Sequence, residues 1–264
     1  MAGKRRDLSI PWPFAPSEVA LNRDTNLLKL VAMLTMFCDH AGKMLFPQYS
    51  VLRIIGRIAF PIYAYCLAVG CVYTRNPLNY LKRIALLALI TQPVYAVCLD
   101  HSVPQMYAVS FAERPLEAAW NFYIHSWDKT PSILVTLAMG LILIWAIRER
   151  QLIIAAATFI LCWQIQGKLN YGMRGVALML LFYLLCTRRW LSLPCVLAFM
   201  LWWGMRGSGY SLFGVSFGIQ TFAILALPLI YIRTNSGIKL PKWLFYGFYP
   251  AHLVLIYLLD HFVL

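Results

Sequence analysis

The feature that most constrains the fold of this chain is a series of long apolar stretches, separated by short segments that carry most of the charge. Of the 264 residues, 61% are hydrophobic and 12% are charged, whereas a soluble domain carries about 25% charged residues. A membrane-spanning helix needs about 20 mostly apolar residues. The sequence therefore predicts an all-α, polytopic membrane helix bundle: a single domain over residues 27–264, after an N-terminal segment over residues 1–26.

Nine membrane spans are expected from the apolar stretches, and the shortness of the middle stretches leaves eight or ten as alternatives. The count rests on the length of helix needed to cross the hydrocarbon core. The expected spans are 27–45, 54–73, 82–99, 132–147, 152–167, 174–187, 190–204, 212–232 and 244–262.

The distribution of basic residues predicts the orientation of these spans. Lysine and arginine recur in alternate connections, beginning with Lys4, Arg5 and Arg6 before the first span, and such connections face the cytoplasm. The N-terminus is therefore expected in the cytoplasm and the C-terminus outside, with the protein in a bacterial inner membrane. The net charge of +13 is then expected to contact anionic membrane lipids and not nucleic acid.

The connection over residues 100–131 is too long for a simple turn between helices. It mixes aromatic and apolar residues with charges. It is expected on the outer face, either as an interfacial helix or as a lid over a cavity.

The first two expected spans carry ionisable residues at membrane depth. Asp39 and His40 are adjacent, and Arg53 and Arg57 are four residues apart. Such groups cost about 3 kcal/mol or more each unless they pair or line a wet cavity. Adjacent helical residues do not face each other, so Asp39 is expected to pair with Arg57 or Arg53. His40 is a candidate general base; a purely structural pairing of these groups is the alternative.

Two further positions are candidates for function. Lys29 lies eleven residues before His40 and so on the same helix face, where it either holds a phosphate or extends to the lipid headgroups. His252 follows Tyr249 and Pro250 in the last span, and it is either a second reactive group or a packing histidine. The seven cysteines have no metal or redox spacing, and no metal is expected. The remaining histidines are expected near the outer surface without a role: His101, His125 and His261.

Four motifs cover most of the chain: the pair Asp39 and His40; the run Gly56, Arg57, Ala59, Phe60, Pro61 and Ala64; the run Tyr171, Gly172 and Gly175; and the run Phe248, Tyr249, His252 and Leu253. In their residues and their order along the chain, these motifs resemble the TraX family of integral membrane acetyltransferases. The spacing of Lys29 and His40 is also similar to a motif of membrane sugar O-acetyltransferases.

The resemblance implies an acyltransferase that takes an acetyl group from cytoplasmic acetyl-CoA. The type member of the family is similar to an N-acetyltransferase of conjugative pilin, and here the acceptor is left open as the amine or hydroxyl of a peptide, sugar or lipid. His40 is expected to act as base or to carry the acetyl group, with Asp39, Arg57 and His252 as its catalytic partners. The residues expected to bind the donor are Lys29, Arg53, Arg75, Lys82, Arg83 and Tyr249. A transporter for a small anion or lipid is the alternative function.

Overall fold

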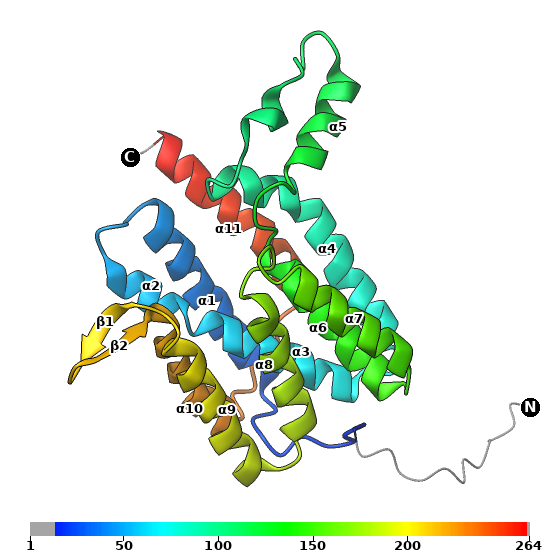
Figure 1. Cartoon of the computed structure of the whole chain (residues 1–264), viewed down its shortest axis with the longest axis vertical. Helices are drawn as coiled ribbons and strands as arrows, with labels where there is room; N and C mark the ends of the chain where they lie inside the picture. Colours follow the sequence, from blue (N-terminus) through cyan, green and yellow to red (C-terminus); the bar gives the residue numbers. More distant parts are fainter. Residues whose placement is uncertain (1–13, 263–264) are drawn as a thin grey trace, which may run out of the picture.

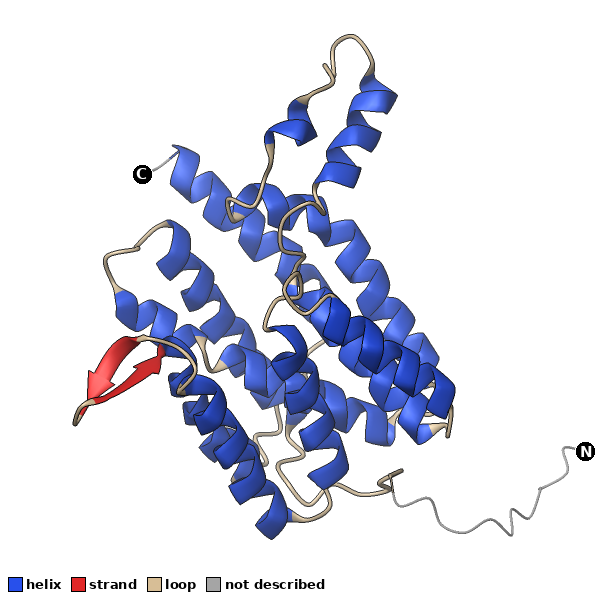
Figure 2. Ribbon diagram, viewed as in Figure 1, coloured by secondary structure: helices blue, strands red, loops and turns tan. Residues whose placement is uncertain are grey.

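The computed structural model describes residues 14–262 and is mostly helical (Figures 1 and 2). The basic residues Lys4, Arg5 and Arg6 lie outside this range. Two short 3-10 helices are η1 (Pro104–Tyr107) and η2 (Ile219–Ala226). The α-helices are α1 (Thr25–Met44), α2 (Ser50–Gly56), α3 (Ala59–Tyr73), α4 (Pro77–Cys98), α5 (Pro115–His125), α6 (Ile133–Arg148), α7 (Leu152–Gln164), α8 (Gly172–Leu185), α9 (Arg189–Gly204), α10 (Leu227–Tyr231) and α11 (Lys242–Phe262).

The prediction of an all-α, membrane-type protein is supported, but the prediction of nine spans is not. Within the described residues, three helical segments are long and apolar enough to cross a membrane: Ser50–Tyr73, Pro77–Cys98 and Trp243–Phe262. Helix α1 has 20 residues but carries several charged side chains. The expected spans 152–167 and 174–187 correspond to helices of only 13 and 14 residues.

The expected span 54–73 is interrupted between α2 and α3. Pro61 has no backbone N–H, so it cannot donate to the carbonyl of Arg57, four residues earlier, as a helical residue would. The helix ends at Gly56 and restarts at Ala59. The interruption lies at Arg57, one of the residues singled out by the sequence.

The expected span 212–232 is wrong over residues 212–218. Strands β1 (Gly209–Leu212) and β2 (Val215–Gly218) form an antiparallel hairpin there, followed by η2 and the short α10. The two turn residues, Phe213 and Gly214, both have positive φ, of 50° and 80°, as the tight turns of two-residue hairpins require. Apolar composition alone does not distinguish such a hairpin from a helix.

The 100–131 connection forms an arm that stands away from the bundle (Figure 1). It contains η1 and α5, which pack on each other. Its base is fixed by Gln92 of α4, whose side chain donates to the carbonyl of Ser126 at 2.7 Å and accepts from the backbone N–H of Ser132 at 2.9 Å. The connection thus contains a helix, α5, and its place at the membrane interface stays a prediction.

Helix α3 lies at the centre of the bundle. Of the apolar window within Ser50–Tyr73, 72% of the residues are buried, against 22% for that of Trp243–Phe262. Helix α3 packs against α1, α6 and α8. The peripheral helices therefore expose apolar side chains that would face lipid, and the central helices hold the polar residues described below.

The predicted orientation can be tested with single cysteines on exposed positions at opposite ends of the bundle. We expect Glu113→Cys, in the arm, to react with a membrane-impermeant maleimide in intact cells. We expect Asn235→Cys, before α11, to react only after permeabilisation, because that connection is predicted to be cytoplasmic. The unmodified protein is the control, since five of its seven cysteines are buried. The opposite labelling pattern would invert the orientation.

Candidate functional site

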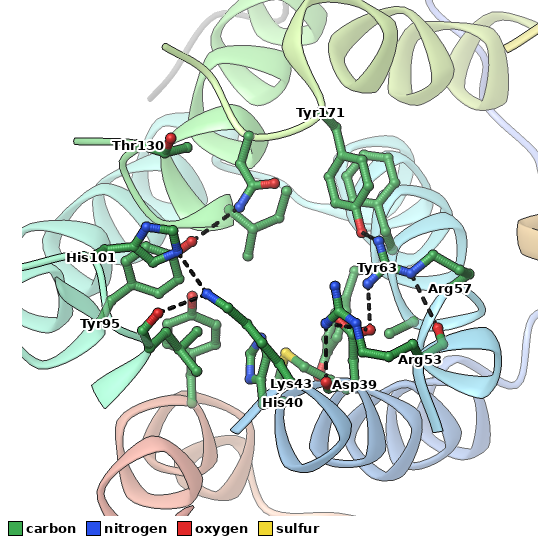
Figure 3. Close-up of a pocket in the computed structure, with 18 residues that line it drawn as sticks. Asp39, His40, Lys43, Arg53, Arg57, Tyr63, Tyr95, His101, Thr130 and Tyr171 are labelled. Atoms are coloured by element: carbon green, nitrogen blue, oxygen red, sulfur yellow. Dashed lines mark hydrogen bonds and ion pairs between the residues drawn. The ribbon is translucent and has the colours of Figure 1, made fainter. Parts of the chain in front are cut away.

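The carboxylate of Asp39 is shared by two arginines across the contact between α1 and α2 (Figure 3). Nη1 of Arg53 lies 3.0 Å from Oδ1 of Asp39, and Nη2 of Arg57 pairs with the same oxygen. Arg57 also donates to the hydroxyl of Tyr171 at 3.2 Å. The sequence left the partner of Asp39 open between Arg53 and Arg57, and the structure contains both ion pairs.

Gly56 allows this close contact between the two helices. A Cβ atom at this position would collide with the side chain of Asp39. The glycine that precedes Arg57 is therefore required by the approach of α2 to α1, and not by an unusual backbone angle.

His40 and His252 form a hydrogen-bonded pair that joins α1 to α11. Nδ1 of His40 lies 2.8 Å from Nε2 of His252, and Nδ1 of His252 lies 2.7 Å from the carbonyl oxygen of Phe248. A carbonyl oxygen only accepts, so Nδ1 of His252 donates. With both rings neutral, Nε2 of His252 then accepts from Nδ1 of His40. Nε2 of His40 is left with a lone pair, and no hydrogen bond to it is recorded within residues 14–262.

Lys43 lies one turn beyond Asp39 and His40 on α1 and contacts the end of α4. Its Nζ donates to the carbonyl of Leu99 at 2.7 Å and to Nε2 of His101 at 3.1 Å. Burial, then the charges of Lys43 and Lys129, lowers the pKa of His101 to about 4, although Asp100 acts in the opposite direction. His101 is therefore neutral at physiological pH and accepts from the lysine.

These groups line a cavity of about 250 Å³ toward the end of the bundle at which α1 ends. Figure 3 shows Lys43 and His101 on one side of the hollow and Arg53, Arg57 and Tyr171 on the other. His252 does not line the cavity, although it contacts His40. The other lining residues are mainly aromatic or apolar and include Met36, Phe60, Tyr63, Tyr95, Ile133 and Tyr249.

A second cavity, of about 720 Å³, lies toward the opposite end of the bundle. Its cationic lining residues are Arg23 before α1, Lys29 in α1, Arg75 between α3 and α4, and Arg83 in α4. Nζ of Lys29 lies 5.1 Å from the centre of the Phe245 ring. Two residues that the sequence predicted to bind a donor lie elsewhere: Lys82 is exposed and outside this lining, and Arg53 lines the smaller cavity. The structure therefore does not bring together all the predicted donor-binding residues.

Four residues line both cavities and form the wall between them: Met36, Tyr63, Ile133 and Tyr249. The hydroxyl of Tyr249 is buried and makes no hydrogen bond of ordinary geometry among the described residues. The same is true of the hydroxyl of Ser132, beside Ile133. The two hydroxyls interact with each other, so the wall contains one polar pair.

Sequence reasoning missed one residue of the smaller cavity, assigned no role to a second and included a third only in a motif. Lys43 is one turn from His40, a spacing that the helical period makes visible, but it lies at a helix end, where lysine commonly extends to headgroups. His101 was expected to have no role, because it follows α4 in a surface connection. Tyr171 was seen only as part of a motif, and its ring stacks on Phe60 with centroids 4.2 Å apart.

Comparison with known proteins assigns the family. The TraX protein family matches residues 24–260, which is nearly the whole chain. The chain belongs to the TraX family. The region of the chain that matches therefore includes all the residues of both cavities except Arg23.

Two individual relatives match over shorter regions. One is the probable fimbrial assembly protein FimC, serogroup H1, of Dichelobacter nodosus, 27% identical over 119 residues, which are 44% of this chain and 43% of the relative. The other is the uncharacterized protein RP591 of Rickettsia prowazekii (strain Madrid E), 45% identical over 40 residues, or 15% of this chain and 16% of the relative. The matches thus span less than half of each relative. None of the solved structures gives a significant match.

The shared carboxylate predicts unequal effects of removing its partners. We expect Asp39→Asn to lower the free energy of unfolding by about 3–5 kcal/mol, because it leaves two guanidinium groups without their anion. Arg57→Gln should cost less, since Arg53 still pairs with Asp39. In a protein that already carries Asp39→Asn, Arg57→Gln should lower the free energy of unfolding by less than it does in the unmodified protein. Denaturant unfolding in detergent, followed by circular dichroism, measures the three variants, and simply additive losses would show that Asp39 and Arg57 are not energetically coupled.

Proposed function

We propose that this protein is an integral membrane acyltransferase. It moves an acetyl group from acetyl-CoA in the larger cavity to an amine or hydroxyl of an acceptor in the smaller one. The observation that carries the proposal is that the two cavities meet at a shared wall, with Lys29, Arg75 and Arg83 lining the larger cavity and His40, hydrogen-bonded to His252, lining the smaller one. We assign the larger cavity to the cytoplasm, following the orientation predicted from the basic connections.

The larger cavity has the properties that a donor site needs. Its volume is within the range of about 300–1,000 Å³ typical of small-molecule sites. The phosphates of acetyl-CoA would be held by Lys29, Arg75 and Arg83, which are among its lining residues. The amide groups of the thioester arm would then meet the hydroxyl of Tyr249, which lines both cavities.

In the smaller cavity, His40 would accept a proton at Nε2 from the acceptor amine or hydroxyl as the acceptor attacks the thioester carbonyl. His252 would stabilise the positive charge that develops on His40 through the hydrogen bond at Nδ1. The carbon–sulfur bond breaks, and the thiolate of CoA takes the proton back from His40. Alternatively, Nε2 of His40 attacks the thioester first, and the carbon–sulfur bond breaks to release CoA as the thiolate. The acceptor then attacks the acetyl carbon, the bond to Nε2 breaks, and the acceptor proton passes to the thiolate. Both routes need the same free lone pair on Nε2.

The contacts assign supporting roles to two residues expected to act directly. Both ring nitrogens of His252 have partners, and Arg57 is committed to Asp39 and Tyr171. Both are therefore better suited to positioning than to contact with the thioester oxygen. Of the two arginines, Arg53 is the more exposed, with 30% of its side chain accessible against 9% for Arg57, so Arg53 is the one that can contact a bound substrate.

The acceptor class that fits the relatives best is a protein subunit of a surface fibre. One relative is described as a probable fimbrial assembly protein, and an exposed N-terminal amine is a nucleophile that such a subunit offers. Sugar and lipid acceptors remain compatible with the same chemistry.

The alternative function is transport of a small anion or lipid. Two cationic cavities separated by a wall would also suit alternating access to a binding site. Incubation of the purified protein with labelled acetyl-CoA separates the two, because only an acyltransferase releases free CoA or becomes acetylated.

The donor site can be tested with two lysines on neighbouring parts of the same end of the bundle. We expect Lys29→Gln to weaken acetyl-CoA binding about tenfold, since it removes one charged contact to a phosphate. We expect Lys82→Gln to leave the affinity unchanged, because Lys82 lies outside the cavity lining. Isothermal titration calorimetry in detergent measures both. Equal effects of the two changes would indicate only a loss of general surface charge.

The reactive group can be tested at His40. We expect His40→Ala to lower acetyl-CoA turnover by about 10²–10⁴-fold, the usual contribution of a general base, while acetyl-CoA affinity is retained. His125→Ala is the matched control, since His125 lies in α5 of the arm and pairs with Asp128. An active His40→Ala protein would exclude both routes through Nε2.

A further inference from the structure

The smaller cavity contains more positive than negative charge. Its cationic lining residues are Lys43, Arg53 and Arg57, and Asp39 is its only carboxylate among the described residues. Both arginines pair with that one carboxylate. The cavity therefore has an excess of two positive charges when its histidines are neutral.

Lys43 is the cation of this cavity that has no negatively charged hydrogen-bond partner among the described residues. Its two hydrogen-bond partners are the carbonyl of Leu99 and the ring of His101, and neither carries a negative charge. The low pKa of His101 keeps that ring neutral at physiological pH. Asp100 and Lys129 act on this region with opposite signs, and neither lines the cavity.

An excess of cations in a partly buried cavity is unfavourable unless an anion enters it. Ionisable groups within membrane proteins normally pair with one another or with a ligand, and lysine and arginine together are well suited to carboxylate or phosphate oxygens. Figure 3 shows Lys43 and Arg53 on opposite sides of the hollow, with open space between them.

We propose that the smaller cavity recognises its acceptor through an acidic group, a carboxylate or a phosphate, bound by Lys43 and Arg53. The proposal rests on the proposed function and names the acceptor class of that site. Lys43 and His40 are three residues apart on α1, a spacing that brings their Cβ atoms within about 5–6 Å. The acidic group of the acceptor therefore lies close to the nucleophile that His40 activates. Lys43 and Arg53 are positioning residues in this arrangement.

Two pairs of small probes that differ in charge test the proposal and distinguish the two acids. One pair is alanyl-glutamate amide and alanyl-glutamine amide; the other is phosphoethanolamine and ethanolamine. Binding to the purified protein in detergent is measured by saturation-transfer NMR at pH 7 and constant ionic strength. We expect the acidic member of at least one pair to bind at least about tenfold more tightly than its neutral partner. The pair that shows the preference identifies the acid.

Variants then locate the preference. It should be lost in Lys43→Gln, retained in Lys43→Arg, and unchanged in Lys168→Gln, which removes an exposed charge outside the cavity lining. Absence of a charge preference in the unmodified protein overturns the proposal whether or not the variants fold, and so does a preference that survives in Lys43→Gln. Because binding is measured without acetyl-CoA, this result is independent of acetyl-CoA turnover, which tests the proposed function separately.

Discussion

The ion pairs around Asp39 are the interaction on which the rest of the site depends. The carboxylate of Asp39 on α1 forms ion pairs with both Arg53 and Arg57, and these pairs join α1 to α2. Through Arg57 the same cluster reaches Tyr171 at the start of α8. Removing one member of such a buried group leaves a charge without a partner, which is more costly than the net contribution of the pair. His40 and Lys43 lie on the same helix within one turn, so their positions follow from this contact.

The sequence was informative where the chemistry is local to one helix or to neighbouring helices. Ionisable residues in an apolar stretch identify a polar site, and the four-residue spacing of Arg53 and Arg57 places both on one face. The contact between His40 and His252 could not be predicted, because the residues are 212 positions apart and a helix alone does not specify its neighbour. Lys43 was missed and His101 was assigned no role because each lies at the end of a helix, where solvent or headgroups usually account for a polar side chain.

Hydrophobicity predicted the span that the structure has over Ser50–Tyr73, but it did not predict the break within that span or the hairpin at the start of the expected span 212–232. The break between α2 and α3 follows from the missing N–H of Pro61, and this proline was visible in the sequence. The β1–β2 hairpin replaces part of an expected helix because apolar residues alternate between glycines, with a Phe213–Gly214 turn between the two strands. In both places the proportion of apolar residues was high enough for a membrane helix. A proline accounts for the break, and glycines bound the hairpin and its turn.

The charge of the two cavities has a consequence for the membrane itself. A protein that passes an acetyl group between two faces of a membrane contains a potential leak for protons and sodium ions. Fixed positive charges raise the electrostatic energy of any cation that enters a narrow passage, as they do in channels that exclude protons. Lys29 on one side of the wall and Lys43 and Arg53 on the other would each oppose such entry. In a protein that works as proposed, the residues that attract anionic substrates would therefore also help the membrane keep its ion gradients while the thioester arm passes the wall of Tyr63 and Tyr249.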